Sequence, residues 1–167
     1  YAAGRENTSG TSNTAVGSQA FDANTTGNKN TAIGRLSLSA NTTAHDNTAV
    51  GANSLKVNTT GSDNNAFGRD SLDACTTGSQ NVAFGSFALG SLTTGAFNTA
   101  VGVGALQTAT TPNNNTAVGQ TALALCTTGS ENVAVGRLAL HSATTGNNCI
   151  GIGYSALQAM TTGANNI

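Results

Sequence analysis

A glycine recurs every 17 residues along this chain, with no insertion or deletion within the series. A fixed period of this length predicts a solenoid, in which each repeat forms one coil that stacks on the next. Surface loops normally vary in length, so a period without slippage indicates that the whole coil is held in place. We therefore expect an all-β chain, a parallel β-roll or solenoid of about ten 17-residue coils. The recurring glycines are Gly17, Gly34, Gly51, Gly68, Gly85, Gly102, Gly119, Gly136 and Gly153.

The Asn-Thr-Ala-Val-Gly segment, first seen at 13–17, is the best strand of the repeat. A 17-residue coil is too short for a strand and a helix, and β-branched residues alternate along this segment. One column holds only Val, Ile or Phe, and the column before it holds only Ala, except for Gly151. A large apolar column beside a small one predicts two packed faces, one inside the coil and one in close contact with something else. The large column begins with Val16, Ile33 and Val50.

A second strand is expected at the Ala/Ser-Leu pair, whose leucine column includes Leu38, Leu55 and Leu72. The Thr-Thr-Gly segment predicts a turn with its glycine, Gly27 in the first full coil, at positive φ, which costs little only for glycine. The invariant glycine column marks the other bend or a tight approach between chains. Stacked Asn amides can hydrogen-bond from coil to coil as a ladder. The asparagine column that predicts this ladder begins with Asn13, Asn30 and Asn47.

Composition argues against several classes of partner. Charged residues make up 8% of the chain and the formal net charge is −1, so the clustered Lys and Arg that bind nucleic acid or anionic membranes are missing. No apolar run approaches the roughly 20 residues of a membrane span. We expect no nucleic-acid partner and no direct membrane insertion. Because the sequence starts and stops within a repeat, residues 1–167 are expected to be one repeat domain from a longer fibre.

Three cysteines do not make a disulfide framework. Cys75 and Cys126 share a column but lie three coils apart, about 14 Å at the spacing of stacked strands, which is too far for one bridge within a chain. These two and Cys149 are expected to be small buried or half-buried side chains. Bonds between chains are the alternative.

Three segments of the chain resemble a known repeat: Asn-Thr-Ala-Val-Gly at 13–17, Asn-Thr-Ala-Ile-Gly at 30–34 and Asn-Val-Ala-Val-Gly at 132–136. The chain is similar to the head repeats of YadA-like trimeric autotransporter adhesins, with the motif Ser/Asn-x-Ala-Ile/Val-Gly-x-x-Ala, and to trimeric phage-tail and bacterial surface fibres. The resemblance covers the whole chain. It implies a left-handed parallel β-roll, a homotrimer around a common axis, and an extracellular place on a bacterial cell surface or in a virion tail fibre. Family repeats are usually a few residues shorter, so no ligand transfers directly.

The small apolar content of each coil also favours an oligomer. A coil offers about two sizeable apolar side chains, one from the Val-type column and one from the Leu-type column, against the entropy lost in ordering the whole coil. Association of several chains, with the small columns buried against one another, would add the missing burial.

No residue pattern typical of catalysis or of a cofactor site stands out. His45 and His141 occupy different variable columns, without the recurring Ser, Cys or carboxylate that a triad or an acid–base pair needs. Asp63, Asp70 and Asp73 form the one acidic cluster, where a bound cation is a minor alternative. The Gly-Gly-x-Gly-x-Asp calcium signature of some β-rolls is missing. We expect no enzyme activity, no cofactor and no metal.

Charged residues occur only in the variable columns, as solvent exposure predicts, and none lies between Asp73 and Glu131. An apolar, uncharged band on a fibre is typical of a contact surface for a glycan or protein of a host or prey cell, or for a neighbouring fibre. The alternative is that these side chains fold inward or line the seam between chains. The candidate recognition residues of this band are Phe87, Leu92, Phe97 and Val103, together with Leu125.

The leading hypothesis is a non-enzymatic segment of a trimeric surface fibre, acting as a rigid spacer or binding a host-cell glycan or protein. The alternative is a monomeric Thr-rich β-solenoid that binds ice, because Thr25 and Thr26 recur at regular spacing along the axis. Adjacent residues tend to face opposite ways, so Thr-Thr makes a weaker flat array than Thr-x-Thr would. A polysaccharide-cleaving solenoid is a third class, disfavoured by the lack of paired carboxylates on one face.

Overall fold

Nine short parallel strands form one continuous sheet in the computed structural model, which describes residues 2–167. Each strand pairs with the next strand in the sequence, and Thr14, Thr31 and Thr48 are successive partners. This pairing keeps the 17-residue step of the sequence throughout the sheet and confirms the predicted parallel solenoid. The strands are β1 Thr14–Val16, β2 Thr31–Ile33, β3 Thr48–Val50, β4 Asn65–Phe67, β5 Val82–Phe84, β6 Thr99–Val101, β7 Thr116–Val118, β8 Val133–Val135 and β9 Ile150–Ile152.

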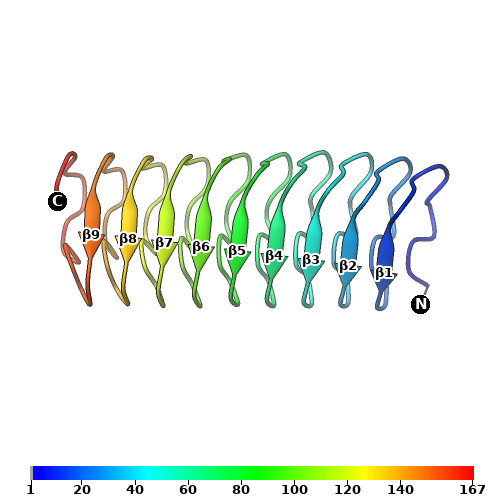
Figure 1. Cartoon of the computed structure of the whole chain (residues 1–167), viewed down its shortest axis with the longest axis horizontal. Coiled ribbons are helices and arrows are strands. Elements are labelled where there is room, and N and C mark those ends of the chain that lie inside the picture. Colours follow the sequence, from blue (N-terminus) through cyan, green and yellow to red (C-terminus); the bar gives the residue numbers. More distant parts are fainter. Residues whose placement is uncertain (1) are drawn as a thin grey trace.

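The solenoid is a straight rod with its two termini at opposite ends (Figure 1). The strands run down the near side, the return segments run up the far side, and the chain advances from right to left, which makes the coil left-handed (Figure 1). The nine strands mark about eight full turns, fewer than the ten coils that the repeat count suggests, because the residues before β1 and after β9 form incomplete coils. No helix occurs in residues 2–167.

The interior of each coil is one side chain deep. The central alanine of the strand, Ala49 for example, is fully buried and belongs to the same apolar cluster as the fully buried leucines of the return segments, such as Leu55. Phe21 takes the place of the leucine in the first coil and is also buried. The three cysteines lie in the same interior as free thiols, as predicted.

The predicted second strand is wrong. The Ala/Ser-Leu pair lies in a run of turns, and its leucines adopt φ values between 47° for Leu38 and 54° for Leu123. This left-handed conformation is costly for a side chain with a Cβ, but it bends the chain so that the leucine points into the narrow interior. The backbone still bonds to the next coil, since Leu38 N–H donates to the Ser54 carbonyl at 3.0 Å.

The two glycine columns have different roles. The invariant column marks a bend with φ between 123° at Gly153 and 136° at Gly34, and a Cβ at Gly102 would lie 2.5 Å from the Gly119 carbonyl oxygen. The close approach that requires glycine is therefore to the next coil of the same chain. The prediction of positive φ at the Thr-Thr-Gly glycines is wrong, because Gly27 and its equivalents do not have it. They are small because the next coil crowds them.

The predicted asparagine ladder is confirmed. Asn98 N–H donates to the Oδ1 of Asn81 at 3.0 Å, and the Nδ2 of Asn81 donates to the Gly95 carbonyl at 2.9 Å. The same backbone-to-Oδ1 bond recurs in every coil from Asn13 to Cys149. Each amide thus joins two coils and holds the Thr-Thr-Gly turn of the next coil.

A second, shorter ladder was missed by the sequence analysis. Asn24, Asn41 and Asn58 are fully buried, and the Nδ2 of Asn41 donates to the Oδ1 of Asn24 at 2.8 Å. The ladder stops where Cys75 and then Leu92 occupy the column, which leaves the Oδ1 of Asn58 without a partner in the described part of the chain. This column of the interior thus changes from polar to apolar in the middle of the rod, whereas the first ladder continues.

Candidate interaction surface

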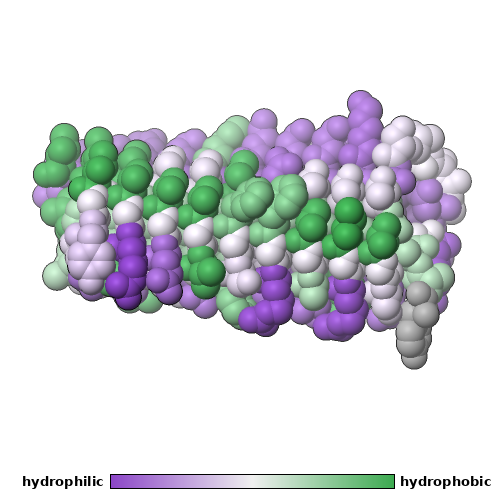
Figure 2. All heavy atoms as spheres, turned by 60° about the horizontal axis from the view of Figure 1, so that its bottom comes forward, coloured by the Kyte–Doolittle hydropathy of each residue, from purple (hydrophilic) through white to green (hydrophobic). Residues whose placement is uncertain are grey.

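An apolar stripe runs the full length of the sheet on its outer face. Val16 on β1, Phe84 on β5 and Ile152 on β9 keep 57%, 51% and 69% of their surface exposed. Figure 2 shows these side chains as a green band from one end of the rod to the other. We call this set the strand-face stripe; it consists of Val16, Ile33, Val50, Phe67, Phe84, Val101, Val118, Val135 and Ile152.

The stripe exists because the interior has no room for its side chains. Successive residues of a strand point to opposite faces, so the alanine between Thr and Val turns inward and the two larger residues turn outward. The small column therefore fills the coil, and the expectation that it is buried against another chain is wrong. It is the large column that is left uncovered. In the middle of the rod two of its members cover each other, since the rings of Phe67 and Phe84 stack with centroids 4.5 Å apart.

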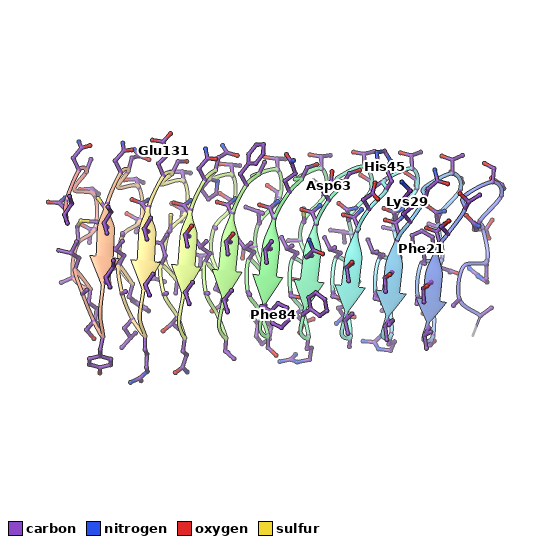
Figure 3. All side chains as sticks on the ribbon, viewed as in Figure 1. Phe21, Lys29, His45, Asp63, Phe84 and Glu131 are labelled. Carbon is purple, nitrogen blue, oxygen red and sulfur yellow. The ribbon has the colours of Figure 1, made fainter. Side chains whose placement is uncertain are left out.

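Two corners flank the strand face. The turn corner, formed by the residue just before the ladder asparagine, lies above the strands in Figure 3, where Lys29, Asp63 and Glu131 are labelled. The glycine corner, formed by the residue just after the invariant glycine, carries Arg35, Arg69 and Arg137. Figure 2 shows hydrophilic side chains along the lower side of the rod, separated from the green band by a narrow pale row.

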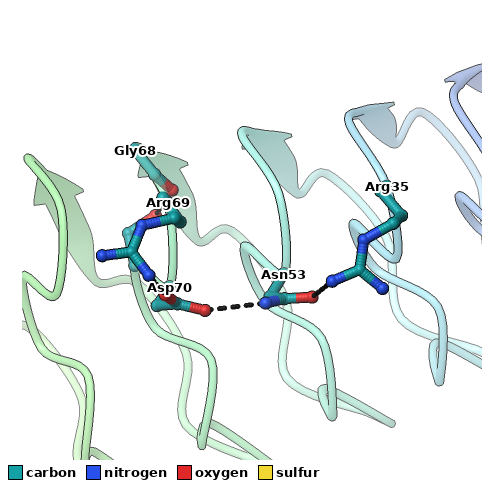
Figure 4. A network of polar contacts seen from close by, with 6 residues as sticks. Arg35, Asn53, Gly68, Arg69 and Asp70 are labelled. Atoms are coloured by element: carbon teal, nitrogen blue, oxygen red, sulfur yellow. Dashed lines mark hydrogen bonds and ion pairs between the residues drawn. The ribbon is translucent and has the colours of Figure 1, made fainter.

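A polar network connects three coils along the glycine corner (Figure 4). Arg35 Nη2 donates to Asn53 Oδ1 at 3.3 Å, and Asn53 Nδ2 donates to Asp70 Oδ1 at 2.8 Å. Arg69 Nη1 forms an ion pair with Asp70 Oδ2 at 2.6 Å, and its guanidinium carbon lies 4.4 Å from the ring centroid of Phe87. The Arg69 side chain is exposed whereas Asp70 is nearly buried. These bonds hold the side chains of this corner in defined positions.

The predicted recognition residues do not form one surface. Leu92 is fully buried because it shares the interior column of Asn58 and Cys75, so it is not a surface contact. Phe87 is half-buried beneath Arg69. Phe97 and Val103 are 56% and 52% exposed, but they lie on different corners, at the two ends of β6. Leu125 is exposed on the return side of the coil.

The three acidic residues considered for a bound cation do not come together as one cluster. Asp63 lies on the turn corner and Asp70 in the network of the glycine corner, whereas Asp73 lies in a return segment. Burial, with the nearby Asp70 charge adding to it, raises the pKa of the Asp73 carboxyl. Residues 2–167 contain no group of three or more His, Cys, Asp or Glu that could hold a metal ion.

The two histidines have separate surroundings. His45 lines an open hollow of about 420 Å³ together with Thr11, Asn28, Lys29 and Asp46. His141 lies on the return side, with its Nδ1 3.5 Å from the Ser142 hydroxyl. In residues 2–167 no carboxylate is hydrogen-bonded to either imidazole, so the third group of a catalytic triad is missing beside both histidines.

Two of the interior thiols, those of Cys75 and Cys126, have low reactivity. Burial raises the pKa of Cys75 and of Cys126 to about 11, partly offset by the hydrogen bonds that the thiols donate to the carbonyls of Gly78 and Gly129. The thiolate is the reactive form of cysteine. These side chains are therefore packing groups at neutral pH.

The two threonine columns of the Thr-Thr-Gly turn differ. The Thr25 hydroxyl donates to the Thr42 carbonyl of the next coil at 3.1 Å, and this bond recurs along the rod. The side chains of Thr26 and its equivalents are exposed. The exposed threonines form an unbroken row: Thr26, Thr43, Thr60, Thr77, Thr94, Thr111, Thr128, Thr145 and Thr162.

Comparison with protein families, curated proteins and solved structures finds no match to this chain. The described residues also include no helix long and apolar enough to span a bilayer. Any functional conclusion therefore depends on the geometry of the rod and on its exposed strand-face stripe.

Proposed function

We propose that this chain is a non-enzymatic segment of an extracellular fibre in which several copies lie side by side and bury their strand-face stripes against one another. The single observation that carries this proposal is a large apolar side chain on the outer face of every strand of a charge-poor rod, exposed on six strands and half-buried on β3, β4 and β8. Contiguous apolar surface of this extent is uncommon on monomeric proteins and typical of interfaces. Interfaces between identical subunits are also richer in apolar area than other surfaces.

A second copy suits the stripe better than an unrelated partner does. The stripe repeats with the coil, at the roughly 4.8 Å spacing of stacked strands, and an identical rod presents the same repeat. Fully burying a Val, Ile or Phe side chain contributes about 1.5–3 kcal/mol, so covering the exposed half in each of nine strands adds several kcal/mol per chain. The resemblance to YadA-like heads and trimeric phage or bacterial fibres supports three copies around a common axis.

Within such a fibre the segment acts first as a rigid spacer. Every coil is tied to the next through its strand and the asparagine ladder, so the rod resists bending. The dispersed positions of Phe97 and Val103 do not support one ligand site between them. Binding of a host- or prey-cell glycan or protein would use the return side, which faces away from the stripe; a glycan array with the wild-type fibre tests this role.

The assembly is tested by size-exclusion chromatography with light scattering. A trimer has three times the 16.4 kDa mass of the chain, about 49 kDa. Phe84→Asp and Val101→Asp each place a charge in the stripe and should yield monomers that retain their β-sheet circular dichroism. Thr94→Asp, on the exposed threonine row, is the matched control and should leave the mass unchanged. A monomeric wild type, or stripe variants that assemble like the control, would exclude the proposal.

Ice binding is a second candidate, favoured by the unbroken row of exposed threonines that starts at Thr26. The row is a single rank, because the neighbouring Thr25 hydroxyls are bonded to the next coil. Thermal hysteresis of the wild-type protein decides this candidate. A measurable effect that disappears in Thr77→Ala, Thr94→Ala and Thr111→Ala would favour ice binding over the fibre.

A further inference from the structure

The turn corner and the glycine corner vary together along the rod. In each coil their residues lie six positions apart, at the two ends of one strand, as at 63 and 69 or 131 and 137. In two coils the turn corner has an acid and the glycine corner has an arginine. Phe97 is the aromatic residue of the turn corner, and its coil carries Val103, the one aliphatic residue larger than alanine in the glycine corner. The pairs are Ser12/Ser18, Lys29/Arg35, Asp46/Ala52, Asp63/Arg69, Gln80/Ser86, Phe97/Val103, Asn114/Gln120, Glu131/Arg137 and Asn148/Tyr154.

No contact within one chain explains this match. A strand with its flanking residues holds the two members of each pair apart, by as much as about 20 Å at 3.3 Å per residue. The ion pairs of residues 2–167 are Arg5–Asp22 and Arg69–Asp70, so Asp63, Glu131 and Arg137 have no ionic partner there. Phe97 and Val103 are both exposed.

We infer that the turn corner of one copy lies along the glycine corner of the next copy, at the same height in the rod. This inference rests on the proposed side-by-side assembly and specifies its geometry. In a closed cyclic assembly, neighbouring copies are related by a rotation about an axis parallel to the rod, with no shift along that axis. This rotation brings the turn corner of one copy to the glycine corner of the next at the same height. Asp63 then faces Arg69 of the next copy, Glu131 faces Arg137, and Phe97 packs on Val103. We call these contacts the corner seam.

Other arrangements match less well. An axial offset of one coil would place Phe97 against Ser86 or Gln120, and Glu131 against Gln120 or Tyr154. An antiparallel pair that buries both stripes would place each corner against the same corner of its partner. With the nine strands in full overlap, Arg35 would face Arg137, and like charges at an interface oppose association. Phe97 would face Asp63 and Val103 would face Arg69, and only Lys29 would gain an opposite charge, at Glu131.

The corner seam also accounts for the uncharged middle of the chain. Phe97 and Val103 form its apolar centre, and the two charged pairs lie two coils to either side, at β4 and β8. One pair is unfavourable, because the positively charged Lys29 would face the positively charged Arg35 of the next copy. This exception predicts that replacing Lys29 by an acid strengthens the assembly.

Charge exchange at one pair tests the seam. Glu131 and Arg137 are both exposed, so Glu131→Arg and Arg137→Glu should leave the coil folded. Each single variant replaces an attraction by a repulsion and should raise the concentration of half-dissociation about 3- to 30-fold at low salt. The double variant restores an opposite-charge pair and should return to within about twofold of the wild type. Lys29→Glu should lower that concentration by about 2- to 10-fold.

The outcomes separate the seam from the assembly itself. Sedimentation at about 50 mM and 1 M salt should show the differences between variants at low salt and their loss at high salt, where charges are screened. If the wild type sediments as a single chain, both the assembly and the seam are excluded. Two other outcomes would exclude the corner seam but not the assembly. In the first, the wild type assembles and the double variant dissociates as readily as the effects of the two single variants added together. In the second, the single variants have the same concentration of half-dissociation as the wild type. Circular dichroism of each variant verifies folding, and Glu131→Arg carries the test if Arg137→Glu fails to fold.

Discussion

Replacing Asn81 by alanine tests whether the buried asparagine ladder holds the coils together. Asn81 is fully buried in the middle of the rod, and its side chain bonds to the Asn98 N–H at 3.0 Å and to the Gly95 carbonyl at 2.9 Å. Neither backbone group has another hydrogen-bond partner, so Asn81→Ala leaves both of them buried and unpaired. An unsatisfied buried group costs about 1–3 kcal/mol. The free energy of unfolding should therefore fall by about 2–6 kcal/mol.

Asn113 provides the matched control. Its Oδ1 also accepts a backbone N–H from the preceding coil, that of Ala96 at 2.8 Å, but this bond is exposed. Water replaces it in Asn113→Ala, so the loss should stay below about 1 kcal/mol. Urea unfolding followed by circular dichroism measures both variants, and hydrogen exchange should show lost protection of the Asn98 amide in Asn81→Ala alone. Equal losses in the two variants would refute the structural role of the ladder.

Two further predictions concern the bends and the interior thiols. Gly102→Ala should cost at least about 3 kcal/mol of unfolding free energy, because φ there is 135° and the new Cβ would meet the next coil. Gly90→Ala, where a new Cβ would come no closer than 3.3 Å to the Phe87 carbonyl oxygen, should cost clearly less in the same assay; equal losses would contradict the close approach at Gly102. Burial raises the pKa of Cys75 and Cys126 to about 11 from 9.0, so the folded state disfavours their thiolates. Stability should hold below pH 9 and fall as pH rises toward 11, and a pH series of urea unfolding with the double Cys→Ala variant as control should show this fall in the wild type only.

The structural features that could be predicted from the sequence were those that follow directly from the 17-residue repeat. The 17-residue step requires identical columns to stack, so the strand at 14–16 and the Asn13 ladder followed directly. The second ladder at Asn24 was also visible in the same way, as an asparagine that recurs with the same step at Asn41 and Asn58. The recurrence was clear, whereas its burial depended on the path of the return segment.

The wrong predictions arose where alternating large and small residues are compatible with two different backbone paths or two choices of inner face. An Ala-Leu pair reads as a strand, but here the leucine bends the backbone into the left-handed region so that it can fill the interior. Alternation at the strand also does not tell which face is inside, and the narrow coil admits alanine there and excludes valine. The uncharged band of the sequence was divided for a similar reason: Leu92 lies inside, whereas Phe97 and Val103 lie at opposite ends of one strand.

The mass per unit length of the rod tests the central claim most directly. Exposed sheet edges at β1 and β9 allow rods to stack end to end, so total mass alone does not distinguish stacking from lateral association. Small-angle X-ray scattering of a rod gives its mass per length. The side-by-side fibre predicts three times the value of a single solenoid, which advances about 4.8 Å per 17-residue coil. A mass per length equal to that of one solenoid, at any total mass, would contradict burial of the strand-face stripe between copies.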